Sequence, residues 1–143
     1  MEKKIKNLYN KDNNSAYETL LELEKLSVDS NELYPYFDEF LSMLKSEKTF
    51  MRVRGFRLIC SLAKWDSDLK INSNIDEILN VFENEKSTAI RQYLEKIDLI
   101  LMYKKELKDI IKNKLTNIDL SNHKESMQTL IKKDIEHILD ISS

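Results

Sequence analysis

Glycine and proline are almost absent from this chain: its 143 residues include one of each, Gly55 and Pro35. Hairpins, bulges and tight turns need residues that adopt positive φ, and glycine supplies most of them. A sheet protein of this length would carry many more glycines, which argues against all-β and doubly wound α/β folds. Because Gly55 stands alone, a glycine-rich phosphate-binding loop is excluded as well. The scarcity predicts an all-α fold.

Apolar residues recur at helical spacing along nearly the whole chain, with no linker or low-complexity segment between them. The pattern predicts one continuous domain of helices joined by short polar breaks. Ser15 and Glu18 form a capping-box pattern that should open the second helix. The fourth helix is predicted at about 50–65 and the sixth at about 88–103.

Two consecutive helix pairs repeat each other when the chain is shifted by 38 residues. The shift places Phe56 on Leu94 and Trp65 on Tyr103. Helix hairpins that cannot bury their apolar faces alone stack on one another, so the repeat predicts serial pairs around a common core. The predicted core residues are Phe37, Phe40, Leu41, Leu44, Phe56, Ile59, Leu62, Ile78, Leu79, Leu94, Ile97, Ile100, Ile131 and Ile135.

The repeat resembles those of HEAT-type and HEAT-like α-solenoids. In such repeats a hydrophobic–Arg pair opens the second helix and is followed by small and large apolar residues, a pattern that Met51-Arg52, Gly55 and Ile59 fit. The resemblance implies an all-α, right-handed α-solenoid of about four stacked helix pairs. The predicted parts of this single domain are an N-terminal capping pair at 1–30 and repeats at 31–70, 71–103 and 104–143.

A second resemblance lies in the segments Tyr34–Phe40, Arg52–Cys60 and Ala63–Asp66. They look like a small family from low-GC Gram-positive bacteria, some of whose members carry a label borrowed from the SufBD iron–sulfur assembly scaffold. Cluster assembly needs several thiolate or imidazole ligands, and the chain offers Cys60, His123 and His137. The residues therefore do not support that label, and we expect no cofactor and no metal site.

One face of the fourth predicted helix is basic, while the rest of its circumference is apolar. At 100° per residue, Arg54, Arg57 and Lys64 share an arc of about 80°. Trp65 borders this arc, and the 38-residue shift gives Tyr103 the equivalent place in the next repeat. Arginine beside a large aromatic is typical of interface hot spots. We therefore expect these five residues to lie together on the exposed concave surface and to bind a partner; the alternative is a solvated face.

The remaining polar groups on apolar faces are predicted to be structural. Arg52 lies in the middle of the apolar arc, where a cation needs a partner, so it should bond carbonyls of the preceding helix end or an acid. Cys60 should be an inert buried side chain. His123 and His137 are 14 residues apart without a metal-binding motif, so we expect surface histidines.

Charge and hydropathy restrict the partners. Lys and Arg number 23 against 25 Asp and Glu, so the net charge is −2, whereas duplex-binding domains ordinarily carry a basic excess. The longest apolar run, Leu99–Tyr103, is far short of the roughly 20 residues of a membrane span. Met1–Lys6 lacks an apolar signal region, and a lone cysteine forms no intrachain disulfide. We therefore expect a cytoplasmic protein that does not bind membranes.

Two functions remain open at this point. The first is a non-catalytic protein-interaction or scaffold module that presents its concave face to another protein or a peptide. The second is a nucleic-acid-binding or DNA-repair enzyme related to the HEAT-like alkylpurine DNA glycosylases. The absence of a catalytic set favours the first, with nucleic acid as the less favoured partner. The sequence does not define an oligomeric state.

Overall fold

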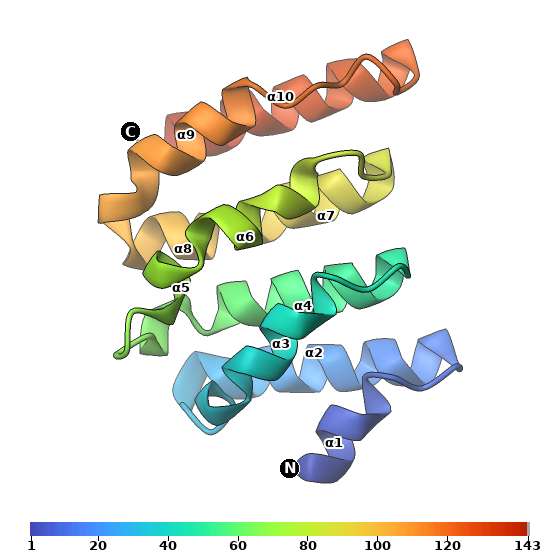
Figure 1. Ribbon diagram of the computed structural model, residues 1–143, viewed down its shortest axis with the longest axis vertical. Helices are drawn as coiled ribbons and strands as arrows, with labels where there is room; N and C mark the ends of the chain where they lie inside the picture. Colours follow the sequence, from blue (N-terminus) through green and yellow to red (C-terminus); the bar gives the residue numbers. More distant parts are fainter. Residues whose placement is uncertain (143) are drawn as a thin grey trace.

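Helices dominate the computed structural model, which describes residues 1–142. No strand occurs within this range, so the predicted all-α class is confirmed. Figure 1 shows the helices stacked along the longest axis of the molecule, with α1 at one end and α10 at the other.

The longer helices follow one another in space in the order of the chain. Helix α4 packs between α2 and α7, and α7 packs between α4 and α10. We call this row the long-helix layer. Its members are α2 (Asn13–Asp29), α4 (Thr49–Ser61), α7 (Ser87–Lys96) with its continuation α8 (Asp98–Tyr103), and α10 (Glu125–Ser142).

Shorter helices accompany the long ones. Helix α1 contacts α2, α3 contacts α4, and α9 contacts α10, while Figure 1 shows α6 beside α7. The short helices are α1 (Glu2–Asn7), α3 (Phe37–Met43), α5 (Lys70–Ser73), α6 (Ile75–Leu79) and α9 (Lys108–Thr116). The 3₁₀ turns are η1 (Tyr34–Tyr36), η2 (Ala63–Trp65), η3 (Asn80–Phe82) and η4 (Lys105–Leu107).

The start of α2 differs from the predicted one. The Asp12 side chain accepts hydrogen bonds from the backbone N–H groups of Asn14 and Ser15, so Asp12 is the N-cap. The Ser15 hydroxyl instead accepts a hydrogen bond of 3.1 Å from the Asn7 side chain. The capping-box prediction is therefore wrong, because Asp12 caps the helix three residues earlier and Ser15 ties α1 to α2.

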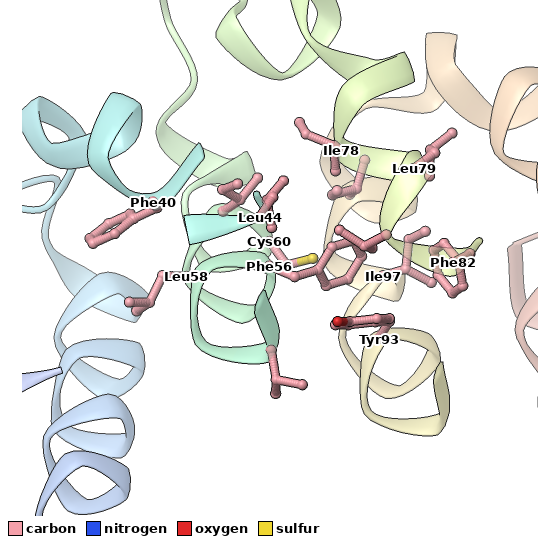
Figure 2. Packing of buried hydrophobic residues seen from close by; sticks show 14 of the residues in the cluster. Phe40, Leu44, Phe56, Leu58, Cys60, Ile78, Leu79, Phe82, Tyr93 and Ile97 are labelled. Atoms are coloured by element: carbon pink, nitrogen blue, oxygen red, sulfur yellow. The ribbon is translucent and has the colours of Figure 1, made fainter. Parts of the chain in front are cut away.

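Apolar side chains fill the space between the helices and form one core. Every predicted core residue is buried except Leu41, which packs against the core while partly exposed. Three aromatic rings meet near its centre: Phe56 lies 4.7 Å from Tyr93 and 5.8 Å from Phe82 between ring centroids. Figure 2 shows these rings between α4 and the following helices.

Gly55 lies where α3 and α4 approach closely. A Cβ atom built there would lie 2.6 Å from the carbonyl oxygen of Phe40 and 2.7 Å from the Cβ of Met43. Neither atom is the far end of a flexible side chain, so α3 as a whole would have to move. The single glycine therefore serves a helix contact and not a turn.

Replacement of Gly55 by alanine is expected to destabilise the protein. The substitution gains about 1 kcal/mol of helix propensity, but overpacking of a core costs about 1–3 kcal/mol. We expect the upper part of that range, because the new Cβ would meet the Phe40 carbonyl oxygen, a backbone atom. We expect a net loss of up to about 2 kcal/mol in urea denaturation followed by circular dichroism. A variant more stable than the wild type would contradict the close approach of α3.

Candidate partner-binding surface

Arg54 is buried, so the prediction that it is exposed is wrong. Only 4% of the residue is accessible. Its guanidinium donates to the Leu8 carbonyl at 2.7 Å and to the Asn13 side chain at 3.3 Å. Leu8 directly follows α1, where carbonyls lack partners within the helix. Arg54 therefore holds the end of α1 and the start of α2 against α4.

Arg57 is buried as well, so the prediction that it is exposed is also wrong. It donates two hydrogen bonds to the Glu24 carboxylate, at 2.9 and 2.8 Å, and a longer one of 3.3 Å to Gln92. Burial alone would lower the pKa of Arg57, but the hydrogen bonds and charge of Glu24 outweigh it and the pKa is raised. Arg57 therefore joins α2, α4 and α7.

Lys64 and Trp65 contact the last turn of α2. The Lys64 ammonium donates to the Val28 carbonyl at 2.6 Å, and the Trp65 indole N–H donates to the Ser27 carbonyl at 2.7 Å. Both carbonyls lie in the turn that has no further helical N–H to accept from. Lys64 is exposed and Trp65 is half-buried.

Tyr103 is exposed and ends α8, which packs against η2 and thus lies beside the segment that contains Trp65. The five predicted partner-binding residues therefore fall into a buried group and a group at the surface. Arg54 and Arg57 face the neighbouring helix pair because the basic arc of α4 is turned toward α2, while Lys64, Trp65 and Tyr103 reach the surface. A role of these three in partner binding stays a prediction.

Arg52 has the structural role that its position predicts. It donates to the Ser46 carbonyl at 2.7 Å, and two further hydrogen bonds of 2.8 Å reach the Glu85 carboxylate. The Tyr93 hydroxyl donates to the same carboxylate at 2.7 Å. Burial alone would raise the pKa of Glu85, but the hydrogen bonds from Arg52 and Tyr93 outweigh it and the pKa is lowered. This pair links the start of α4 to the start of α7.

The thiol and the two imidazoles do not form a reactive centre. Cys60 is buried, and burial raises the pKa of its thiol, which disfavours the nucleophilic thiolate. His123 is half-buried and His137 is exposed. Within residues 1–142, no three His, Cys, Asp or Glu side chains come together as metal ligands.

A cleft of about 460 Å³ lies where α2, α4 and α7 meet, and we call it the α2/α4/α7 cleft. Two aromatic side chains on its wall are exposed, Tyr17 by 48% and Phe50 by 40%. The sequence analysis singled out neither residue, because it considered only the basic arc of the fourth predicted helix and the two aromatics that border it. Phe50 lies in the N-terminal turn of α4.

A second cleft, of about 510 Å³, lies between α7 and α10, and we call it the α7/α10 cleft. Its wall includes Arg91, whose guanidinium donates to the Asp134 carboxylate at 2.7 Å. Glu95 and Asp98 line the same cleft. The two clefts therefore differ in charge: the α2/α4/α7 cleft is lined by cations and the α7/α10 cleft mainly by carboxylates, unlike the continuous basic groove that a duplex-binding enzyme needs.

Comparisons with protein-family models, curated proteins and solved structures find no match for this chain. In the part of the chain that the structure describes, every helix is too short or too polar to cross a bilayer. The candidate surface is therefore defined by its own geometry and charge: two adjoining clefts, one aromatic and basic, the other acidic.

Proposed function

We propose that this protein is a non-catalytic interaction module, a HEAT-like right-handed α-solenoid that binds another protein through its long-helix layer. The observation that carries the proposal is the serial packing of α2, α4, α7 and α10, with both clefts opening between these helices. Stacked helix pairs of this kind present extended binding surfaces.

The 38-residue period is supported by equivalent positions in successive long helices. Helices α4, α7 and α10 begin at Thr49, Ser87 and Glu125, which are 38 residues apart in each step. Asp66 and Lys104 are also 38 apart, and their side chains form a buried ion pair of 2.9 Å between adjacent repeats. The same period therefore describes both helix starts and a contact that joins the repeats.

The character of the surface supports a protein partner. Exposed aromatics beside arginine, as at Tyr17 and Phe50, give apolar contact area next to fixed hydrogen-bond donors, a composition enriched in protein interfaces. The acidic α7/α10 cleft lies on the same layer and would repel phosphates. A protein suits this mixed surface better than a nucleic acid does.

Photocrosslinking in an extract of the native host tests the proposal. A photoreactive phenylalanine analogue replaces Thr88, which lines the α2/α4/α7 cleft, and in a matched variant it replaces Lys112 on the exposed side of α9. We expect a discrete protein adduct from position 88 that is absent from position 112. Equal labelling from both positions, or adducts with nucleic acid alone, would contradict the proposal.

A further inference from the structure

We propose that the α2/α4/α7 cleft binds an acidic peptide segment of the partner protein that inserts an apolar side chain between Tyr17 and Phe50. This inference rests on the proposed function and names the chemistry of its partner. It follows from the charges that line the cleft, from the lack of a counter-ion for the buried Arg54, and from the exposed rings of Tyr17 and Phe50.

The cleft is lined by cations and by no carboxylate. Its charged residues are Arg54, Arg57 and Lys86. Arg57 is neutralised by Glu24, but among residues 1–142 neither Arg54 nor Lys86 forms an ion pair. The adjoining α7/α10 cleft is lined mainly by carboxylates, so the two clefts differ in the sign of their charge. An acidic segment therefore complements the α2/α4/α7 cleft and is repelled from its neighbour.

Arg54 adds a buried, uncompensated charge to the attraction that the exposed Lys86 exerts on a carboxylate. Its guanidinium donates hydrogen bonds only to uncharged groups, namely the Leu8 carbonyl, the Asn13 amide oxygen and the sulfur of Met51. A buried cation without a counter-ion is costly, and burial lowers the pKa of Arg54. The charge of Arg54 is therefore not balanced within the described residues and makes the cleft more favourable for an anionic segment.

The exposed rings provide the apolar part of the cleft. The Phe50 ring centroid lies 4.8 Å from the guanidinium carbon of Arg54, and the Tyr17 ring centroid lies 5.6 Å from that of Arg57. Leu20 and Val53, both buried, line the cleft with them. An apolar side chain between the rings would be flanked by cations, which suits a segment that alternates acidic and apolar residues.

Basic charge continues on the other side of Phe50. A neighbouring hollow of about 450 Å³ shares Phe50 and Asn13 with the cleft and is lined by Lys11 and Lys48, again without a carboxylate. Lys48 and Lys86 occupy the N-caps of α4 and α7, and neither helix has a side-chain cap. Cations oppose the helix dipole at these positions, whereas a bound carboxylate would be attracted by lysine and dipole together.

Selection from a phage-displayed library of random 16-residue peptides tests the inference, with the wild-type protein as bait and the Phe50→Ser variant for counter-selection. We expect the enriched peptides to be acidic and to share an aromatic or aliphatic residue. For the most enriched peptide, Phe50→Ser should raise Kd about 30-fold, the equivalent of about 2 kcal/mol. Lys86→Glu should raise Kd about fivefold at low salt, with a smaller effect at high salt.

Two matched variants serve as controls. Ile110→Ser removes an equally exposed apolar side chain from α9, and Lys112→Glu reverses a charge on the same helix. Both should bind the peptide as the wild type does. Folding of every variant is checked by circular dichroism. We expect spectra like that of the wild type, because the substituted side chains are exposed and lie outside the core.

Three outcomes would overturn the inference: no enrichment, enriched peptides that are neutral or basic, or a single-stranded DNA 20-mer that binds more tightly than the peptides and competes with them. If one of these occurs while position 88 still crosslinks a protein, the peptide chemistry is wrong and the proposed function stands. If crosslinking fails as well, both are wrong.

Discussion

Replacement of Asp66 by alanine is expected to lower the free energy of unfolding by about 3–5 kcal/mol, the usual cost of removing one partner from a buried ion pair. The Asp66 carboxylate is inaccessible to solvent and lies 2.9 Å from the ammonium of Lys104, itself buried. It also accepts hydrogen bonds from the Tyr34 hydroxyl and from the backbone N–H groups of Lys70 and Ile71. The substitution therefore leaves a buried cation and three donors without their acceptor.

Urea denaturation followed by circular dichroism measures this loss. Asp68→Ala, two residues away and exposed, is the matched control and should change stability by less than about 0.5 kcal/mol. Adding Lys104→Met to Asp66→Ala should recover part of the loss, because it removes the stranded charge. A cost below about 1 kcal/mol for Asp66→Ala, or no recovery in the double variant, would contradict the buried pair.

Glu85→Gln is expected to cost about 3–5 kcal/mol as well. The Glu85 side chain is 2% exposed and accepts from both Arg52 and Tyr93. A neutral amide cannot balance the guanidinium, and its NH₂ group would face the N–H groups that now bond an oxygen. Burial and the Glu85 carboxylate raise the pKa of Tyr93, so the phenol stays protonated and remains a donor to that carboxylate.

The pH dependence of unfolding gives a second readout for Glu85. Its pKa is lowered in the folded protein, so it contributes stability above its unfolded pKa, and this contribution is lost as pH falls through the folded pKa. Asp66 behaves in the same way. We expect the wild type to lose stability steeply below about pH 4 and the Glu85→Gln variant to lose less over the same range. Parallel curves for the two proteins would contradict the assignment.

The core was predictable because it depends on periodicities that the sequence displays directly. Apolar stripes at helical spacing and the 38-residue shift together select the residues that face the neighbouring helices, such as Phe56 and Ile97, and both are buried. Arg52 was predictable for a related reason: a cation within an apolar arc requires a partner, and Glu85 provides it.

The orientation of the basic arc was not predictable from one helix alone. A helical wheel shows that Arg54 and Arg57 share a face, but not what lies opposite that face. Their partners are more than thirty residues away in the chain, at Leu8 and Glu24. Because α2 covers this arc, residues that look like an exposed stripe instead hold the first helix pair against α4.

The sequence also contains information about two features that the helical wheel does not show, namely the Asp66–Lys104 ion pair and the exposure of Phe50. Asp66 and Lys104 follow Trp65 and Tyr103, which the 38-residue shift superimposes, so opposite charges at equivalent positions could have indicated a pair between repeats. Phe50 could have been recognised as exposed, since it lies in the first turn of its helix, two residues after Lys48 in the polar break. The first case needed a comparison of successive repeats, and the second needed the position of the residue within its helix.

Residues of α4 and its neighbours have two separate roles, one in stability and one, as we propose, in binding. Buried cations of α4 hold the helix pairs together, and we propose that the exposed rings beside them contact a partner. An ¹⁵N-labelled amide NMR spectrum recorded with the selected acidic peptide tests this most directly. We predict that shift changes cluster at Tyr17, Phe50, Val53, Ala89 and Gln92 in the α2/α4/α7 cleft. Changes confined to α3, α6 and α9, or spread evenly over the protein, would contradict the account.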